Sequence, residues 1–549
     1  MDIFDLSTGI LSYGSLNEDD KLAIRTFLRE TPPSKILLLP SNQNSESFSE
    51  QKWASVASEA LLFEALFKFV IKEMAADLDT SEWLPYSREL TELICYLLRP
   101  LPGRWIWSDD SFAETKTLWK QQQAFRLAAE SLMKALQQIL LFLPDFEGSR
   151  VVAATAAYIL EDDPWCTSTS NRLAIQILEQ CKETELDYEQ IGHHILSDIV
   201  KPVFECLRKK RVTSIGTLSK DRDHELESSF DTDDSKSWAV LRPEAATLVY
   251  FVLSREKNIQ FTVNNWSLVV PPALTILDDP NPAYKTRGCQ ILHMVLLQTP
   301  PQFILVRGLT DLFWESLLAC LSYLPFGTSN ITLEESIHLL NESYDALITL
   351  ASIRAQDIGS KTAISNLSAA NGNVGLSSPE YKLKYAKYLG QILVEGIYHV
   401  ISISGEQVRI AQLLVQKLGV IASNMKIYFV IHLQNSIKML INILSDPFIT
   451  AYPPLLVTTL DTLDIIIENT APRISIYKFQ ILKGLLVSWK KTCESDEHGT
   501  NLDNVKKKLY ATAKLLKTKT TLGDVEAEKN WGEIVAAVED LGPTYVGLL

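Results

Sequence analysis

Apolar residues recur along most of this chain at spacings of three and four, which is the period of an amphipathic helix. The segment from Ser55 to Ala76 is the broadest example, because its apolar face is wide enough for a buried helix. The same pattern continues through residues 89–98, 112–143, 151–160, 172–181 and 188–207. No segment sustains the strict apolar–polar alternation of a half-buried strand. The pattern therefore predicts an all-α protein made of helix hairpins joined by short polar loops.

Three apolar segments that are expected to be helices end at the same dipeptide, an aspartate followed by a proline. The three copies are Asp163-Pro164, Asp279-Pro280 and Asp446-Pro447. Proline pushes the preceding residue out of helical geometry, and the aspartate can then cap the helix that follows. In two copies an arginine, Arg172 or Arg287, stands at the next helix start. The paired carboxylates Asp162-Asp163 and Asp278-Asp279 could suggest acid–base catalysis, but at a helix boundary capping explains them.

The central copy gives the clearest repeat unit. After the early prolines Pro271 and Pro272, it contains Leu277, Asp278, Asp279, Pro280, Arg287 and Gly288. This order resembles a HEAT repeat, in which an aspartate lies in the turn and an arginine opens the second helix. The aspartate is expected to cap that helix and to pair with an arginine of its own or a neighbouring repeat. The predicted fold is an α-solenoid of HEAT-like helical-hairpin repeats.

Two polar segments interrupt the helical pattern. Residues 207–237 are charged and serine-rich, and they carry too few apolar residues to offset the entropy of ordering, so a disordered linker is predicted there. Its basic cluster from Lys209 to Arg211 could be a nuclear import signal, and Ser228 could be a phosphosite, although a solvated loop explains both. Residues 356–379 are predicted to be a flexible insertion. The expected organisation is an N-terminal helical region, 1–206, and a C-terminal HEAT-like repeat region, 238–549.

Composition narrows the class of protein. The 549 residues carry a formal net charge of −15, which disfavours nucleic acid as a main partner because phosphates must be neutralised by cations. The apolar run from Leu268 to Leu277 is too short to span a bilayer and contains two prolines. No basic leader precedes the first helices, so a protein inside the cell, without a membrane partner, is expected. Seven scattered cysteines without close pairs predict reduced core thiols.

Signals for catalysis are weak. The sequence has no phosphate-binding glycine loop, no nucleophile elbow and no zinc-protease motif. His193-His194 near Cys206 cannot readily share a metal, because neighbouring side chains on a helix point about 100° apart. His293 and Cys289 lie on one helical face, but two ligands do not make a site. We predict no catalytic residue, no cofactor and no metal.

Aromatic residues near turns are the candidates for contacts with a partner. Trp and Tyr are favoured at the centres of protein interfaces, although each of these residues could equally cap the core of its own hairpin. The candidates are Tyr452, Pro453, Trp489, Lys490 and Trp531.

A wider set of motifs is more specific. The Leu277 to Pro280 block with Arg287-Gly288-Cys289 is followed by Gly308 to Trp314, Ser322 to Pro325 and Leu339 to Leu347. Together they resemble the Tti-two family, chiefly over residues 238–470. The resemblance implies a non-enzymatic subunit of the Triple T co-chaperone complex, with Tti-one and Tel-two as protein partners. It also implies a role in maturing phosphatidylinositol-3-kinase-related kinases with the major cytosolic chaperone, in the cytoplasm and also in the nucleus.

Two other interpretations stay open from the residues. A nuclear transport adaptor of the importin or armadillo type should repeat a Trp-Asn pair along a groove, whereas Asn265-Trp266 occurs once. An enzyme on a helical scaffold should gather aspartate-rich motifs at one cavity, whereas here the Asp-Pro sites lie at expected turns.

Overall fold

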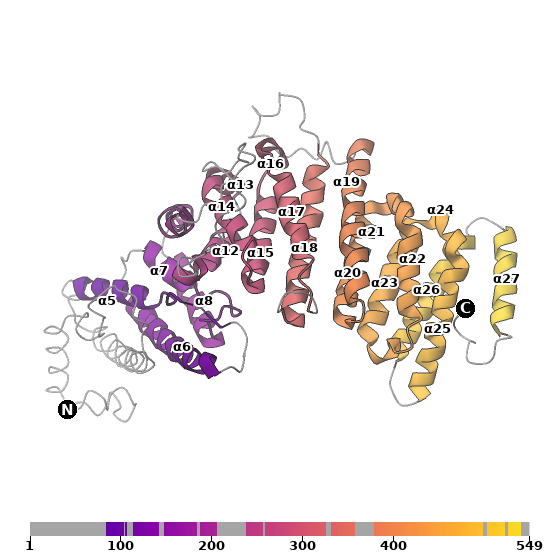
Figure 1. The fold of residues 1–549 in the computed structure, drawn as a ribbon, viewed down its shortest axis with the longest axis horizontal. Helices are drawn as coiled ribbons and strands as arrows, with labels where there is room; N and C mark the ends of the chain where they lie inside the picture. Colours follow the sequence, from indigo (N-terminus) through magenta and orange to yellow (C-terminus); the bar gives the residue numbers. More distant parts are fainter. Residues whose placement is uncertain are drawn as a thin grey trace. The chain divides into compact units, whose positions relative to one another are not determined.

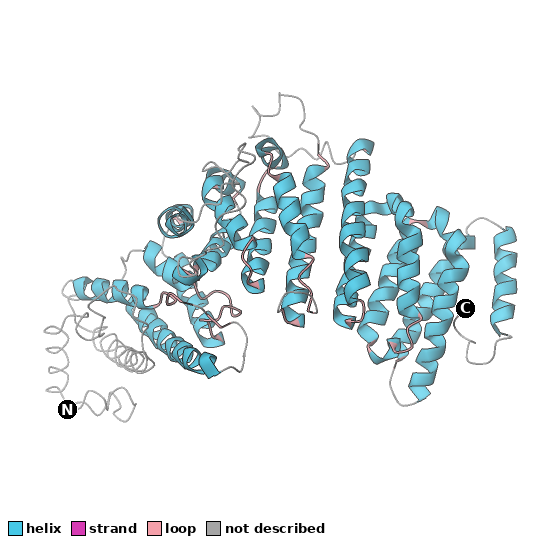
Figure 2. Cartoon of the chain, in the orientation of Figure 1, coloured by secondary structure: helices cyan, strands magenta, loops and turns pink. Residues whose placement is uncertain are grey.

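In a computed structural model the described part of the chain consists of helices joined by turns and loops, with no strand among those residues (Figure 2). The described residues are 84–103, 105–106, 113–141, 148–183, 187–205, 238–255, 258–325, 331–356, 378–497, 502–521, 525–539 and 548. The chain divides into two compact units, Met1–Asp278 and Asp279–Leu549.

The first unit contains eleven described elements. They are α5 (Leu84–Leu97), α6 (Ala113–Leu140), α7 (Gly148–Ala156), α8 (Ser168–Glu183), α9 (Tyr188–His194), the π-helix η3 (Ile195–Val200), α10 (Lys201–Glu205), α11 (Trp238–Leu241), α12 (Ala245–Arg255), α13 (Ile259–Asn264) and α14 (Trp266–Leu277). Here α8 packs against α6 and α7, while α12 and α14 pack against η3. The phenol of Tyr158 donates to the Leu98 carbonyl at 2.7 Å, which ties the end of α7 to the end of α5.

The second unit begins at the second Asp-Pro turn. Its elements are α15 (Pro282–Gln298), α16 (Pro301–Arg307), α17 (Thr310–Cys320), α18 (Leu333–Arg354), α19 (Pro379–Gln391), the π-helix η6 (Ile392–Tyr398), α20 (His399–Ser404), α21 (Val408–Met425), the 3₁₀ turn η7 (Lys426–His432), α22 (Leu433–Leu444), η8 (Ile449–Ala451), α23 (Pro453–Asn469), α24 (Ala471–Ile474), η9 (Ser475–Tyr477), α25 (Lys478–Glu497), α26 (Asp503–Thr521) and α27 (Val525–Glu539).

Within this unit one row of helices forms the inner layer of a stack (Figure 1). The row runs α15, α18, α21, α23 and α26, and each member packs against the next. A second layer covers it, in which α17 packs on α18, α19 on α18 and α21, and α22 and α25 on each other. Each helix thus contacts neighbours along the stack, as in a repeat protein. The predicted all-α fold of HEAT-like helical hairpins is confirmed.

The inner row is also tied together by polar side chains. His293 on α15 contacts Thr349 on α18 at 3.0 Å, and the buried Lys417 on α21 donates to Asp345 on α18 at 2.6 Å. Thr462 on α23 donates to the Val415 carbonyl on α21 at 2.9 Å. We call these three contacts, together with the Lys508 contacts described in the next paragraph, the polar ladder.

The last step of the polar ladder joins α26 to α23. Lys508 lies 2.6 Å from Asp461 and 2.7 Å from Asp464. The HEAT-like pattern led us to expect acidic–basic pairing near the turns, whereas these contacts lie in the middle of the helices. Mid-helix positions set the register of neighbouring helices more directly than a turn does, because both side chains sit on rigid elements.

Helix boundaries follow local chemistry. Asn281 accepts the Ala283 N–H at 2.9 Å and Pro282 opens α15, so a cap and a proline at the first position start this helix. Thr332 and Glu335 form a capping box at the start of α18. Gly308 ends α16 in the left-handed conformation, with φ of 69°.

The expectation that the three Asp-Pro aspartates cap the next helix is wrong. Asp279 and Asp446 each accept the N–H two residues on, from Asn281 at 2.9 Å and Phe448 at 2.7 Å. Both therefore make Asx turns inside the loop. Asp163 is buried and accepts from the Thr247 hydroxyl on α12 at 2.6 Å, so it joins two hairpins 84 residues apart. Arg287 is buried whereas Arg172 is exposed, so these two arginines are not equivalent either.

The observed division of the chain differs from the predicted one. The division between the two units falls between Asp278 and Asp279 in the sequence, and the predicted linker, 207–237, lies outside the described residues. The helices that flank it belong to one unit, where the rings of Phe204 and Trp238 lie 5.3 Å apart. The predicted insertion ends one residue earlier than expected, because Ser378 caps α19 and Pro379 opens it. Most of that insertion, 357–377, is also outside the described residues.

We expect replacement of Asp163 by alanine to lower the free energy of unfolding by about 1–3 kcal/mol, since it leaves a buried hydroxyl without its acceptor. The matched change is Asp446→Ala, which removes an exposed turn contact and should cost no more than about 0.5 kcal/mol. Urea unfolding followed by circular dichroism measures both. An equal decrease in the free energy of unfolding for the two variants would contradict this prediction and show that the two aspartates contribute equally to stability.

The polar ladder gives a second prediction. Asp345→Ala leaves the buried Lys417 ammonium without its carboxylate, and should lower the free energy of unfolding by about 3 kcal/mol. This value is at the low end for a broken buried ion pair, because Asp345 is itself partly exposed. Lys417→Met removes the buried charge, so no carboxylate partner is needed. This substitution should leave the free energy of unfolding nearly unchanged. The exposed pair between Arg409 and Glu334 provides the control, and Glu334→Ala should leave the unfolding midpoint unchanged.

Candidate interaction sites

The two tryptophans predicted to contact a partner are core residues. Trp489 is 8% exposed and Trp531 is 1% exposed. The Trp531 indole donates to the Thr520 hydroxyl at 2.8 Å and so fastens α27 to α26. The prediction of a surface role is wrong for both, because both indole side chains are buried. Lys490 is exposed and pairs with Glu494 one turn further along α25 at 3.8 Å.

Tyr452 instead lines a groove, which we call the α20–α23 groove. It has a volume of about 850 Å³ and lies among α20, α21, α22 and the start of α23. The third Asp-Pro turn forms one wall, which includes Asp446 and Phe448. Pro453 begins α23 beside it and is half-buried. Two of the sequence candidates, Asp446 and Tyr452, are therefore brought together at one site.

Hydrogen bonds hold the walls of the α20–α23 groove in place. The Tyr452 hydroxyl donates to Gln412 Oε1 at 2.9 Å, and the Tyr398 hydroxyl lies 2.7 Å from the Ser436 hydroxyl. Both phenols span neighbouring helices. A groove with such fixed walls is formed before a ligand arrives, which reduces the entropy lost on binding.

The groove also exposes large apolar side chains. Phe448 is 80% exposed, and Val408, which also lines the groove, is exposed as well. Burying a phenylalanine side chain is worth about 1.5–3 kcal/mol, so a contact that covers Phe448 gains that free energy. Apolar side chains that are exposed in a groove are the kind of surface that a ligand or a protein partner can cover.

The neighbouring stretch Val408–Leu444 is apolar enough to resemble a membrane-spanning helix in its composition. An 18-residue window within these 37 residues has the length and hydropathy of a membrane span, and α15 and α16 meet the same criteria when the bent pair is taken together. In the structure the stretch is α21, η7 and α22, with a break at Lys426 where φ is +51°. Its buried residues pack on α23 and α25, and Ile427 and Ile431 are exposed. The apolar character thus serves helix packing and adds to the exposed apolar surface.

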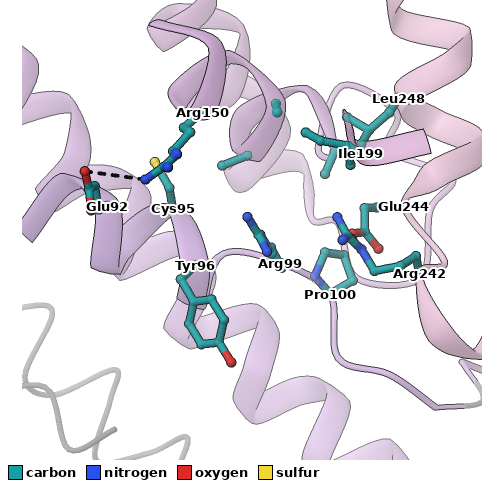
Figure 3. Close-up of a pocket in the computed structure, with 13 residues that line it drawn as sticks. Glu92, Cys95, Tyr96, Arg99, Pro100, Arg150, Ile199, Arg242, Glu244 and Leu248 are labelled. Atoms are coloured by element: carbon teal, nitrogen blue, oxygen red, sulfur yellow. Dashed lines mark hydrogen bonds and ion pairs between the residues drawn. The ribbon is translucent and has the colours of Figure 1, made fainter. Parts of the chain in front are cut away.

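Sequence reasoning missed a second pocket, in the first unit (Figure 3). It has a volume of about 400 Å³ and is lined by Arg99, Arg150, Arg242, Glu92 and Glu244 among others. We call it the arginine pocket. These residues come from segments up to about 150 positions apart in the sequence, and no motif links them. Only the packing of α5, α7 and the start of α12 brings them together.

The histidine candidates make ordinary polar contacts. His193 Nδ1 lies 2.7 Å from Asn265 Oδ1, and His194 pairs with Asp198 at 2.6 Å. Burial lowers the pKa of His293, which contacts Thr349. Across the described part of the chain no three His, Cys, Asp or Glu residues are grouped closely enough to hold a metal ion.

Comparison with known proteins identifies the chain's relatives. A family model described as the Tti2 family matches residues 151–451, which is more than half of the chain. Among solved structures, Kap121p bound to Pho4p aligns with a TM-score of 0.37 and 10% identity, over 94% of this chain and 54% of that one. Importin beta aligns with a TM-score of 0.34 and 11% identity, over 96% of this chain and 62% of that one. The chain therefore spans between half and two thirds of the length of these helical-repeat proteins.

Buried thiols give a direct check on the core. Burial raises the pKa of Cys95, Cys166 and Cys181 to about 12. The reactive thiolate should be scarce in all three, and alkylation of the native chain at pH 8 should be at least about a hundredfold slower than after unfolding. Cys493 is half-buried and should react faster. Mass spectrometry of iodoacetamide-treated protein reports each site, and equal labelling of all cysteines in the native chain would contradict the burial.

Proposed function

The chain belongs to the Tti2 family, and on that premise we propose that it is the Tti-two subunit of the Triple T co-chaperone complex, where it acts as a scaffold without catalytic activity. The observation that carries the proposal is the family match over residues 151–451, which extends through parts of both compact units. Its partners are then Tti-one and Tel-two in a hetero-oligomer, and its clients are phosphatidylinositol-3-kinase-related kinases that mature with the major cytosolic chaperone.

The physical properties of the chain support a binding role. Stacked helical hairpins present long surfaces whose turns vary without disturbing the core. The net charge of −15 disfavours nucleic acid and leaves protein as the natural partner. We place the protein in the cytoplasm, with the nucleus as a second location.

Within this function the α20–α23 groove is the proposed contact with a protein partner. An amphipathic helix laid into it would cover Phe448 and Val408 while its polar side faces Lys438, Asn435 and Asn442, which also line the groove. Tyr452 supplies a phenol of the kind favoured at interface centres. The groove thus offers exposed apolar side chains together with polar ones.

The first experiment is affinity purification of the tagged chain from its own cells, with every co-purifying protein identified. We expect Tti-one and Tel-two in stoichiometric amounts and the large kinases in smaller amounts. A chain that is recovered alone, or mainly with nuclear transport factors, would contradict the proposal.

The same purification tests the groove. Phe448→Ser should leave the thermal midpoint unchanged and lower recovery of a direct partner by about tenfold or more, since a central aromatic contact is commonly worth over 1–2 kcal/mol. Phe479→Ser is the matched control, because Phe479 is 61% exposed on α25 and does not line the groove. Equal recovery with both variants would place the interface elsewhere on the chain and leave the family role intact.

A further inference from the structure

The arginine pocket has a charge arrangement that the scaffold role does not require. Arg99 follows the end of α5, Arg150 is on α7, and Arg242 and Glu244 lie just before α12, while Glu92 comes from α5 (Figure 3). The volume of about 400 Å³ greatly exceeds the roughly 10–15 Å³ that a single water needs. The pocket therefore has room for a small ligand together with its hydration.

Two of the three arginines are neutralised within the pocket. Arg150 lies 3.4 Å from Glu92, and the Arg242 Nε donates to Glu244 Oε1 at 2.5 Å. The Glu244 contact also fixes the orientation of the Arg242 guanidinium, because it engages one side of the planar group. Glu244 also acts on the third arginine, Arg99, but it raises the pKa of Arg99 by less than the positive charge of Arg242 lowers it.

Arg99 is the arginine of this pocket that forms no ion pair with a carboxylate among the described residues. Its guanidinium lies over the Tyr96 ring, 5.7 Å from the ring centroid. In Figure 3 the Arg99 side chain lies in the middle of the residues that line the pocket, between Cys95 and Arg242. Desolvation, and next the positive charge of Arg242, lower the pKa of Arg99. An anion between the two guanidinium groups would relieve this repulsion.

We propose that the arginine pocket binds a phosphate group, held by Arg99 and by the terminal nitrogens of Arg242. Arginine forks match phosphate oxygens through paired hydrogen bonds. Phosphate suits this site better than a carboxylate because its oxygens point in several directions and can serve two guanidinium groups that come from different segments. The group can belong to a free phosphorylated metabolite or to a phosphorylated side chain, and the chemistry at the pocket is the same for both.

The alternative to a bound phosphate is an ion pair within the chain, between Arg99 and Glu244. Glu244 Oε2 is buried and accepts no hydrogen bond, so Arg99 could turn toward it and close the pocket without a ligand. In that case Arg99→Gln would lower the stability of the chain, and phosphate would have no effect that depends on Arg99.

The test uses the full chain and inorganic phosphate as the probe, with sodium chloride adjusted to hold ionic strength constant because surface charges are screened by salt. We expect phosphate at tens of millimolar to raise the thermal midpoint of the wild-type chain by about 2 °C or more. Arg99→Gln should abolish the rise. Arg172→Gln, an exposed arginine of the same unit that does not line the pocket, should retain it.

Two further measurements make the result decisive. Arg99→Lys keeps the charge but loses the fork, so it should fold and bind phosphate several-fold more weakly by calorimetry. Acetate at the same ionic strength should give a smaller midpoint shift than phosphate. A shift that is equal in wild type and Arg99→Gln, equal for acetate and phosphate, or absent altogether would overturn the proposal.

A peptide arm identifies the source of the phosphate. A short peptide carrying phosphoserine is compared with inorganic phosphate and with the unphosphorylated peptide. Tighter binding of the phosphopeptide, by about tenfold, assigns the pocket to a phosphorylated protein, and equal binding of the two phosphates assigns it to a free metabolite. All of these measurements use the chain without partners, so their failure leaves the proposed scaffold function untouched.

Discussion

The second unit depends on one constraint, which is that every helix of its inner row must meet the next in a fixed register. Apolar packing alone tolerates sliding, because leucine and isoleucine faces fit together in several ways. The polar ladder removes that freedom. Lys417 is buried and reaches Asp345, and Thr462 donates to a backbone carbonyl on the helix before it. A slip of one turn would leave a buried ammonium and a buried hydroxyl without partners, at a cost of several kcal/mol.

Because the polar ladder fixes the register of the helices, the turns at the ends of the helices are free to vary and to bind other molecules. Because the inner row carries the register, the turns between helices can expose residues such as Phe448 without weakening the fold. The α20–α23 groove is placed at such an edge, next to the third Asp-Pro turn. The same sequence signal therefore has different uses in the two units. In the first unit Asp163 is drawn into the core to bind Thr247, and in the second Asp446 stays at the surface and shapes a groove wall.

The two candidate sites differ in the kind of ligand they fit. The α20–α23 groove is the larger of the two and is lined by both apolar and polar side chains, which suits an amphipathic helix of a protein partner. The arginine pocket is smaller and charged, and it suits a compact anion. The scaffold role needs the first site, whereas the second would let a phosphorylated ligand bind to the other unit of the same chain.

Local patterns in the sequence determined much of this protein. Helical periodicity gave the all-α class, the prolines marked helix ends, and the motifs between Leu277 and Leu347 indicated the family. These features can be read because periodicity, capping and proline geometry act over a few residues. The tertiary structure alone decided that Trp489 and Trp531 are core residues, that Asp163 binds across 84 positions, and that Arg99, Arg150 and Arg242 share a pocket. Those outcomes depend on which helix faces meet after folding, and the local spacing of residues does not encode contacts between segments so far apart.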